Sequence, residues 1–316
     1  MRSLFVAEPN LPPVLGTNAP QPRPGRGELL IRVCAAGVTP SELSWYPTTH
    51  RQSGEIRACA VPGHEFSGVV AATGEDVDPR ETGAEVFGMN DWYAEGAMAD
   101  FCIAPSFAVA PKPRRLSHVE AASVPIAALT AWQGLFDHAA LQAGERILVH
   151  GAAGGVGIFA VQLASLHGAH TIATASANNA GFLLGLGAER VIDYRSSRFE
   201  DSVRDLDVVF DTVGGDTLER SWSVLKPGGR MVTIASSTEG STDPRAASAF
   251  FIVKPDRKQL VQIADLLDAG RLRTVVDAVV PLSRAADAFA GKAPGQHRGK
   301  VVVAVAAMEE TKEEAI

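Results

Sequence analysis

The chain has 316 residues, 46% of them hydrophobic, and its formal net charge at pH 7 is -7. This length is enough for two domains with sizeable cores. The acidic balance, without any basic cluster, argues against a nucleic-acid partner, and the lack of an apolar run of about 18 residues argues against a membrane span. The three cysteines are Cys34, Cys59 and Cys102, far apart and without a C-x-x-C pair. A disulfide framework is therefore not expected, and we expect a cytoplasmic protein in a reducing compartment.

The first part of the chain, up to about residue 122, has the pattern of a β-rich domain. Residues 1–8 predict a first strand rather than a secretory signal, because the apolar run breaks too soon. Six prolines between residues 9 and 24 predict a long surface loop. Short apolar runs with glycine and proline punctuation follow at residues 29–34, 61–71, 85–88 and 101–103. This spacing predicts a small barrel or sandwich.

A glycine-rich turn at residues 151–157 organises the second part of the chain. It follows the apolar run at residues 147–150 and leads into apolar residues at helical spacing between 159 and 166. Such a turn lets the backbone approach a pyrophosphate, and the free N–H groups at the helix start point at the anion. The match is A-x-G-x-x-G at Ala152, Gly154 and Gly157 rather than the full G-x-G-x-x-G. Because the flanking strand and helix agree, the pattern favours dinucleotide binding over a turn kept only for packing.

Helical and strand patterns alternate from about residue 121 to residue 256. Residues 121–141 predict a helix interrupted at Pro125, and further helices are predicted around residues 182–186 and 216–225. Strands are predicted at residues 147–150, 171–174, 190–193, 208–210, 230–234 and 249–253. Six short, mostly apolar strands with intervening helices predict an α/β fold with a doubly wound, six-stranded parallel sheet.

The pattern changes again after residue 256. An amphipathic helix carries Leu260, Ile263 and Leu267, and a strand near Val275 and a closing strand at residues 300–303 follow. We expect this last segment to return to the first domain. The predicted domains are therefore residues 1–122 with 257–316, and residues 123–256.

The nucleotide preference is read from the end of the second strand of the α/β unit. An NAD site usually has Asp or Glu about 20 residues beyond the first glycine, bonded to the ribose 2′-hydroxyl. Here the strand is followed by Ser176 and Asn179, with no acid between residues 174 and 179. Hydroxyl and amide groups can donate to a 2′-phosphate, and Tyr194 and Arg195 can add a ring face and a positive charge. The sequence thus favours NADP(H) over NAD(H).

These motifs together resemble the medium-chain dehydrogenase/reductase superfamily, in its zinc-independent NADPH:quinone oxidoreductase-like branch. The motifs that carry the resemblance stand in the family's order at residues 36–40, 63–68, 129–131, 151–157, 186–188, 191–194, 210–215, 225–229 and 299–303. The resemblance implies a GroES-like substrate domain, a Rossmann domain and an active site in the cleft between them. It also implies a homodimer formed through the last Rossmann strand, here near Phe250 to Val253.

The zinc-dependent relatives raise the question of a metal. They use the His of the Gly63-His64-Glu65 motif as a ligand and place cysteines where this chain has Thr39 and residues 126–128. Catalytic zinc needs about three protein ligands and an open position. His64 with Glu65 does not supply that set, so we expect no metal, and His64 is expected in or beside the pocket as a hydrogen-bonded residue.

The candidate site residues fall into two groups. Backbone contact with the pyrophosphate is assigned to Gly154, Gly155, Val156 and Gly157, and the 2′-phosphate to Ser176, Asn179 and Tyr194. By resemblance, the nicotinamide half is assigned to Thr130, Val213, Ala235, Phe251 and Val253, and Lys300 is expected either to reach the cofactor or to lie in solvent. The substrate pocket candidates are Thr39, Trp45, Tyr46, His64 and Trp92, the aromatic ones either as a wall for a flat acceptor or as packing between loops. No residue is assigned as general acid.

The predicted function is an NADPH-dependent oxidoreductase that delivers hydride to a quinone or an activated alkene without a metal. The expected partner is thus a small electrophilic acceptor. Three alternatives remain at this point: a 2-enoyl-thioester reductase, a zinc-type alcohol dehydrogenase, and a nucleotide-binding protein without catalytic activity.

Overall fold

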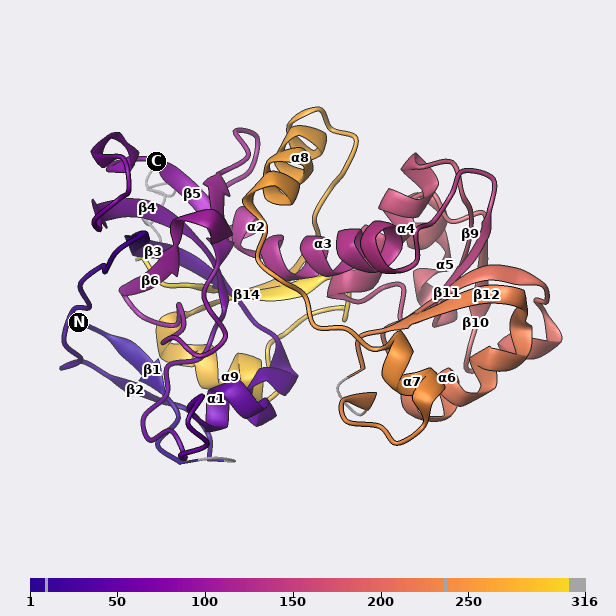
Figure 1. Cartoon of the computed structure of the whole chain (residues 1–316), viewed down its shortest axis with the longest axis horizontal. Coiled ribbons are helices and arrows are strands. Elements are labelled where there is room, and N and C mark those ends of the chain that lie inside the picture. The colour runs from indigo at the N-terminus through magenta and orange to yellow at the C-terminus, as the bar shows by residue number, and fades with distance from the viewer. Residues whose placement is uncertain (9–10, 236–237, 307–316) are drawn as a thin grey trace, which may run out of the picture.

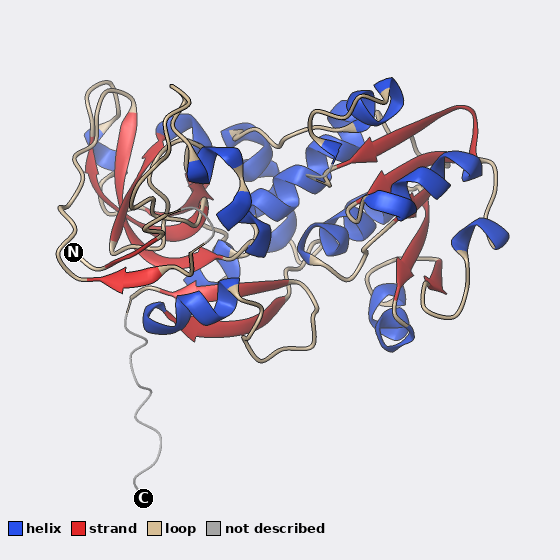
Figure 2. Ribbon diagram, turned by 90° about the horizontal axis from the view of Figure 1, so that it is seen from below, coloured by secondary structure: helices blue, strands red, loops and turns tan. Residues whose placement is uncertain are grey.

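Two β-sheets, one at each end of an elongated molecule, form the frame of the structure (Figure 1). The structure is a computed structural model that describes residues 1–8, 11–235 and 238–306. Helices lie between the seven-stranded sheet of one lobe and the five-stranded sheet of the other, as the view from below shows (Figure 2). No helix in these ranges is long and apolar enough to cross a membrane.

The first sheet has seven strands and draws on both ends of the chain. Its strand order is β13-β14-β3-β4-β5-β7, with β6 paired to β3. The closing strand β14 runs antiparallel to β3, with Val302 opposite Gly37, so the last segment lies in the first sheet. The strands are β3 (Glu28–Gly37), β4 (Glu65–Thr73), β5 (Glu85–Met89), β6 (Phe101–Pro105), β7 (Val109–Pro111), β13 (Val276–Pro281) and β14 (Lys300–Ala304).

A short two-stranded sheet precedes it. It pairs β1 (Ser3–Phe5) with β2 (Val14–Gly16) in antiparallel register. The strand β2 lies inside the stretch that the prolines predict to be a loop throughout, so that prediction was wrong for these three residues. Val14 to Gly16 is the part of the stretch between Pro13 and Pro20, where every residue keeps an N–H that can join a ladder.

The second sheet has five strands, all parallel, in the order β10-β9-β8-β11-β12. The strands are β8 (Arg146–Val149), β9 (His170–Ala175), β10 (Arg190–Asp193), β11 (Leu206–Asp211) and β12 (Leu225–Thr233). After β8 the chain adds β9 and β10 on one side and then β11 and β12 on the other. The glycine turn follows β8, so it lies at the point where the strand order reverses, which is where ligands bind in open α/β sheets.

The predicted sixth strand at residues 249–253 was wrong. Ala249 ends α7, Phe250 makes a single isolated bridge with Thr233, and no ladder follows. Two side chains from distant segments bond the backbone beyond it instead. Trp92 Nε1 donates to the Val253 carbonyl at 3.3 Å, and the Gln133 amide both accepts from Lys254 N and donates to its carbonyl. The segment is therefore held by Trp92 of the first lobe and by Gln133, instead of by a strand ladder.

Helix α3 (Pro125–Trp132) joins the two lobes. Pro125 stands at its first turn, where its missing N–H costs nothing, and all residues from Pro125 to Ala131 are buried. A helix that is apolar all round belongs in a core. It packs between the lobes and continues into a π-helical segment at Gln133–His138.

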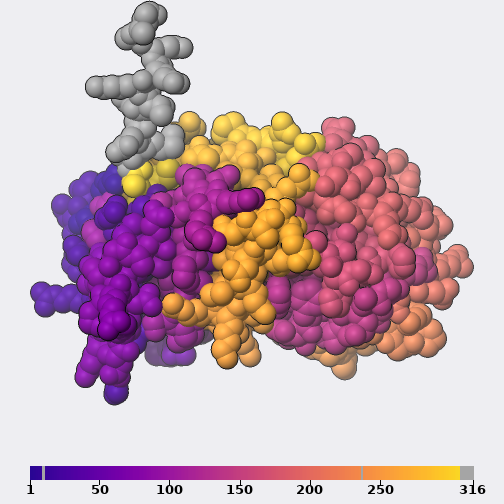
Figure 3. Space-filling view, turned by 90° about the horizontal axis from the view of Figure 1, so that it is seen from above, coloured from indigo at the N-terminus to yellow at the C-terminus, as the bar shows by residue number. Residues whose placement is uncertain are grey.

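Side-chain caps mark the start of some of the remaining helices. Ser117 and Glu120 form a capping box at the start of α2, and Asp256 accepts from Lys258 N and Gln259 N at the start of α8. In the space-filling view the orange segment that contains α8 lies against both lobes (Figure 3). These helices are α1 (Tyr46–Thr49), α2 (His118–Ala122), α4 (Gly155–Leu166), α5 (Ala180–Leu184), α6 (Gly215–Ser221), α7 (Pro244–Ala249), α8 (Arg257–Asp268) and α9 (Ala285–Phe289).

One apolar core runs through both lobes. Phe87, Met89 and Ala110 of the first sheet belong to the same buried cluster as α3, α4 and β8. This shared core fixes the first sheet against the helices of the second. The exact domain boundaries at residues 122/123 and 256/257 stay a prediction.

Candidate active site

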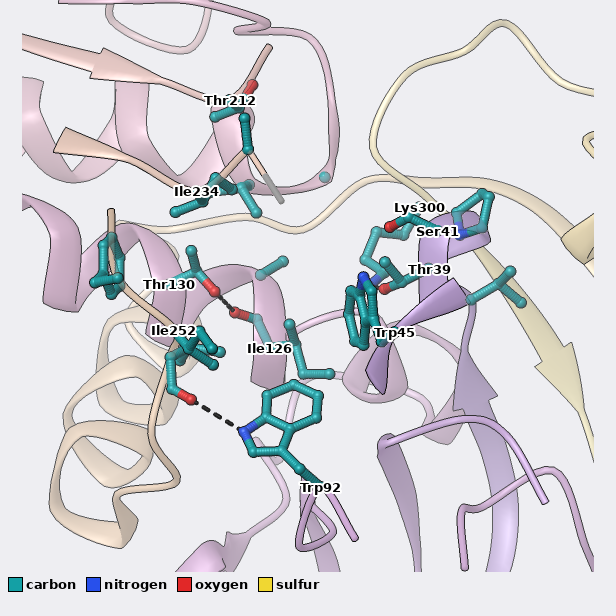
Figure 4. A pocket seen from close by; sticks show the side chains of 18 of the residues that line it. Thr39, Ser41, Trp45, Trp92, Ile126, Thr130, Thr212, Ile234, Ile252 and Lys300 are labelled. Carbon is teal, nitrogen blue, oxygen red and sulfur yellow. Dashed lines mark hydrogen bonds between the residues drawn. The ribbon is translucent and has the colours of Figure 1, made fainter. Parts of the chain in front are cut away.

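A cleft of about 830 Å³ opens between the two lobes. It is lined from one side by the segment after β3 and the loop that carries Trp92, and from the other by the ends of β11 and β12. Helix α3 and the first turn of α4 form its floor, and residues 299–301 run along it. The close-up shows side chains from both lobes facing the same space (Figure 4).

The glycine turn forms one end of this cleft. Gly151 has φ +64°, and a Cβ on Gly157 would lie 2.4 Å from the Gly151 carbonyl oxygen. Only glycine fits both positions, because the first needs a left-handed backbone and the second a close backbone approach. Helix α4 starts at Gly155 with no side-chain cap. The N–H groups of its first turn are thus left for a ligand, which fits a pyrophosphate.

Most of the predicted cofactor residues line the cleft. Those that do are Thr130, Gly155, Val156, Val213, Ala235, Phe251, Val253 and Lys300. Gly154 lies beside Gly299 through an isolated bridge, and Gly157 is buried behind it. Lys300 is 8% exposed and packs its stem on Gly155, so it lies in the cleft wall and the solvent alternative was wrong.

The residues predicted for a 2′-phosphate lie beyond the cleft, after β9 and β10. Asn179 Nδ2 donates to Ser176 Oγ at 3.3 Å. Tyr194 is 58% exposed, and the Arg195 guanidinium lies 5.7 Å from its ring centre. Ser176 and Tyr194 follow adjacent parallel strands, so both stand at the same edge of the sheet.

Arg298 completes this group, although no local sequence pattern pointed to it. Its Nε donates to Asn179 Oδ1 at 2.6 Å, and a second guanidinium nitrogen donates to the Asn178 carbonyl at 2.7 Å. Asp277 fixes the turn that carries it by accepting from three successive backbone N–H groups, those of residues 296, 297 and 298. A cation from the first lobe is therefore held against the nucleotide end of the second.

Aromatic side chains form the wall of the cleft on the first lobe. Thr39, Trp45, Tyr46 and Trp92 all line it. The Trp45 and Trp92 rings meet edge to face with centres 5.4 Å apart. Trp92 also donates to the Val253 carbonyl, so it spans from one lobe to the other (Figure 4).

His64 does not line the cleft. It is 1% exposed, and its ring lies behind Trp92 with ring centres 5.4 Å apart. Its Nδ1 lies 2.7 Å from Glu42 Oε1, which also accepts from Gly63 N at 2.6 Å. Its Nε2 is buried with no partner in the described part of the chain. The Gly63-His64-Glu65 motif made His64 a pocket candidate, but a local motif says nothing about Trp92. In the fold, the ring of Trp92 lies between His64 and the cleft.

A buried ion pair joins Lys300 of the cleft wall to Glu65. Lys300 Nζ donates to Glu65 Oε1 and, at 3.1 Å, to Thr39 Oγ1. Glu65 Oε2 also accepts from Ile126 N at 3.0 Å. Burial raises the pKa of Glu65, and the charge of Lys300 opposes that rise. From the sequence, Glu65 is recognisable only as part of the Gly63-His64-Glu65 motif. Its pairing could not be predicted locally, because its partner Lys300 stands 235 residues away.

The described residues contain no group of three or more His, Cys, Asp or Glu that could hold a metal ion. The acid that contacts the His64 ring is Glu42, and its contacting oxygen already accepts from the histidine and from Gly63 N. Position 39 offers a hydroxyl that accepts from Lys300, and residues 126–128 are apolar and buried.

The fold and the cleft define a two-domain, dinucleotide-dependent oxidoreductase, with a β-rich lobe and a parallel α/β lobe that share one site. Residues 25–114 match the family described as the alcohol dehydrogenase GroES-like domain. Residues 186–303 match the family described as zinc-binding dehydrogenase.

Two curated relatives and one solved structure align along most of the chain. The NAD(P)H oxidoreductase RTN4IP1, mitochondrial, of Danio rerio is 30% identical over 90% of this chain and 85% of its own length. The 2-methylene-furan-3-one reductase of Solanum lycopersicum is 33% identical over 92% of this chain and 74% of its own length. The structure of the quinone oxidoreductase from Coxiella burnetii is 29% identical, covers 96% of this chain and 99% of its own, and has a TM-score of 0.88.

The chain therefore belongs to the medium-chain dehydrogenase/reductase superfamily, and its relatives include quinone oxidoreductase-like NAD(P)H oxidoreductases. The family resemblance and the GroES-like plus Rossmann fold class predicted from the sequence are confirmed, with five strands in the parallel sheet instead of six.

Proposed function

We propose that this protein is a reductase that uses NADPH to reduce a quinone or an activated alkene, without a metal. The observation that carries the proposal is the cleft itself. The cleft contains the start of helix α4, which follows the glycine turn and has no side-chain cap. It also contains an aromatic wall and the Thr39 hydroxyl, which accepts from the buried Lys300 ammonium. The relatives support it, since one is named a quinone oxidoreductase and another a reductase of a furanone that carries a methylene group beside its ketone.

The residues of the cleft fit the cofactor along its length. The first turn of α4 would hold the pyrophosphate on its backbone N–H groups. Thr130, Val213, Ala235, Phe251 and Val253 would border the nicotinamide half. When bound, the dihydronicotinamide supplies a hydride. The chain's own part is to orient it, to exclude water and to hold the acceptor.

We propose NADPH over NADH because of the charges at the nucleotide end. Residues 176–179, which directly follow β9, carry no carboxylate, whereas Ser176, Asn179 and Arg298 form a linked group of donors there. Arginine recognises phosphate through its planar fork of N–H donors, and a 2′-phosphate adds the negative charge that this guanidinium would pair with.

The acceptor side favours a flat, electrophilic molecule. Trp45 and Trp92 offer apolar ring surface, and Trp92 is fixed by its bond to Val253. Hydride addition to the β-carbon of an enone would form a C–H bond there while a C–H bond of the dihydronicotinamide breaks. The C=C electron pair would shift and leave a negative charge on the carbonyl oxygen. Water then protonates the α-carbon, so the net change is addition of H⁻ and H⁺.

The test is an oxidation assay of NADPH against NADH on chelator-treated protein, with quinones and α,β-unsaturated ketones as acceptors. We expect NADPH-selective turnover that survives chelation. Loss of activity on chelation with recovery on adding zinc would favour the alcohol dehydrogenase alternative, and tight NADPH binding without turnover of any acceptor would favour a protein without catalytic activity. A cytoplasmic location also remains our proposal, to be tested by fractionation, since the zebrafish relative is named mitochondrial.

A further inference from the structure

Among the threonines that line the cleft, Thr39 differs in the hydrogen bond that its hydroxyl makes. The Thr130 hydroxyl donates to the Ile126 carbonyl at 2.6 Å, and the Thr212 hydroxyl donates to the His150 carbonyl at 2.8 Å. Thr39 Oγ1 instead accepts, from Lys300 Nζ at 3.1 Å. An ammonium has no lone pair, so the direction of this bond is fixed.

The hydrogen of Thr39 is therefore left for another acceptor. Thr39 stands at the N-terminal flank of the 3-10 turn Pro40–Ser44, where a threonine often caps the helix, yet its side chain makes no capping bond. No hydrogen bond in the described ranges uses that hydrogen. Since Thr39 is half-buried and lines the cleft, its hydroxyl faces the space where an acceptor would bind (Figure 4).

The contacts of Lys300 fix its ammonium beside the Thr39 hydroxyl, where it polarises that group. Its stem packs against Gly155, and its ammonium pairs with Glu65, which is 1% exposed. Glu65 is in turn fixed by Ile126 N of helix α3. A cation donating to a hydroxyl oxygen strengthens the bond that the hydroxyl itself donates. The ion pair thus reaches from the glycine turn to the acceptor side of the cleft.

We propose that Thr39 is the catalytic hydrogen-bond donor that holds the acceptor oxygen as it becomes negative, with Lys300 and Glu65 as its positioning residues. This inference rests on the proposed reductase function. As hydride adds to the β-carbon, the charge that collects on the carbonyl oxygen meets the Thr39 hydroxyl, backed by the Lys300 ammonium. No proton leaves Lys300 in this step, and water supplies the one that ends on the α-carbon. Such a donor acts mainly in the transition state, where the charge develops.

The first experiment compares Thr39→Val, which keeps the shape, with Thr39→Ser, which keeps the hydroxyl. Using the acceptor that wild type turns over best, we expect Thr39→Val to lower kcat about 100-fold with KM little changed, and Thr39→Ser to recover most of that loss. NADPH binding, followed by nicotinamide fluorescence, should stay the same in both. Thr82→Val, at an exposed site away from the cleft, controls for the chemical change.

The second experiment tests the contacts that link Glu65, Lys300 and Thr39. Glu65→Gln with Lys300→Met removes the ion pair without leaving one buried charge behind, and it should lower kcat on its own. If the three residues act as one unit, adding Thr39→Val to this pair should lower kcat far less than it does in wild type. Thermal melting of each variant shows whether it is folded.

The outcomes separate the two proposals. If wild type reduces no quinone or enone, the proposed function fails. If wild type is active and folded Thr39→Val keeps its kcat, or Thr39→Ser loses as much as Thr39→Val, the function stands and the role of Thr39 is overturned. If the effects of Thr39→Val and of the Glu65→Gln, Lys300→Met pair on kcat are fully additive, Lys300 and Glu65 do not act through Thr39.

Discussion

His150 lies directly before the glycine turn with 1% of its surface exposed. Its Nδ1 lies 2.9 Å from Thr174 Oγ1, and its Nε2 lies 3.0 Å from Ser221 Oγ. Burial lowers the pKa of His150 to about 4, although Asp211 opposes that shift. The ring therefore stays neutral in the folded protein at physiological pH, held by two hydroxyls between neighbouring elements.

This burial predicts a specific acid sensitivity. The unfolded chain carries His150 with a pKa of about 6.5, so it takes up the proton first as pH falls. The free energy of unfolding should therefore drop between pH 6.5 and pH 4, by about 2 kcal/mol between pH 7.5 and pH 5 from this residue alone. Urea unfolding at the two pH values measures it. His150→Gln should lose this part of the slope, and His170→Gln, at an exposed histidine, should keep it. An unchanged slope in His150→Gln would contradict the prediction.

Arg298 shows how much one residue can depend on contacts that no local pattern reports. Its partner Asn179 stands 119 residues earlier in the chain. We expect Arg298→Ala to raise KM for NADPH about tenfold and to leave KM for NADH nearly unchanged, because only the first cofactor carries the 2′-phosphate. Steady-state kinetics with both cofactors measure the ratio. Arg114→Ala, at a surface arginine paired with Asp268, should change neither value, and equal losses for NADPH and NADH in Arg298→Ala would assign the residue to general packing.

The start of α4 is the element on which the nucleotide site depends. Gly157 packs so close to the preceding turn that an added Cβ would meet the Gly151 carbonyl oxygen and the Ala152 backbone, at 2.4 Å and 2.6 Å. Both contacts are with backbone, which cannot rotate away as a side chain does. The turn and the helix can therefore accommodate a methyl group only by moving apart.

Gly157→Ala should accordingly lower the free energy of unfolding by about 1–3 kcal/mol and weaken NADPH binding. Gly181→Ala is the matched control, because that helical glycine has nothing within 4 Å of an added Cβ. Alanine there should be neutral or stabilise by up to about 1 kcal/mol. Chemical denaturation and nicotinamide fluorescence measure the two effects, and equal behaviour of the two variants would contradict the packing argument.

Elements with a repeating local pattern were predictable from the sequence. The strands of the parallel sheet, the break at Pro125 and the glycine turn each follow from residues next to one another. The sixth strand failed because the backbone of Val253 and Lys254 bonds to Trp92 and Gln133, which stand 161 and 121 residues away. Glu65 with Lys300, and Arg298 with Asn179, were missed for the same reason. Glu65 and Lys300 meet only because β14 returns to the first sheet, and Arg298 meets Asn179 only where the two lobes come together.

At the scale of the whole molecule, the edge of the parallel sheet next to β12 is the surface to test for assembly. The segment Phe250 to Val253 runs past that edge, with Ile252 49% exposed between two buried neighbours. Within the described ranges, the backbone of Phe251 bonds on one side only, to the Thr233 carbonyl. Exposed, partly bonded edges of this kind pair with another chain unless something covers them.

We therefore expect a homodimer that forms through residues 250–253 of each copy. Light scattering coupled to size exclusion should give twice the chain mass for wild type. Ile252→Lys should shift the mass toward a monomer. In a two-fold symmetric contact the same residue of each copy lies near the centre, so both copies would bury a charge there. Ile56→Lys makes the same change at an isoleucine of the first lobe that is 64% exposed, and it should leave the dimer intact. A monomeric wild type, or a dimer that Ile252→Lys leaves unchanged, would show that the edge is covered within one chain or that the copies meet elsewhere.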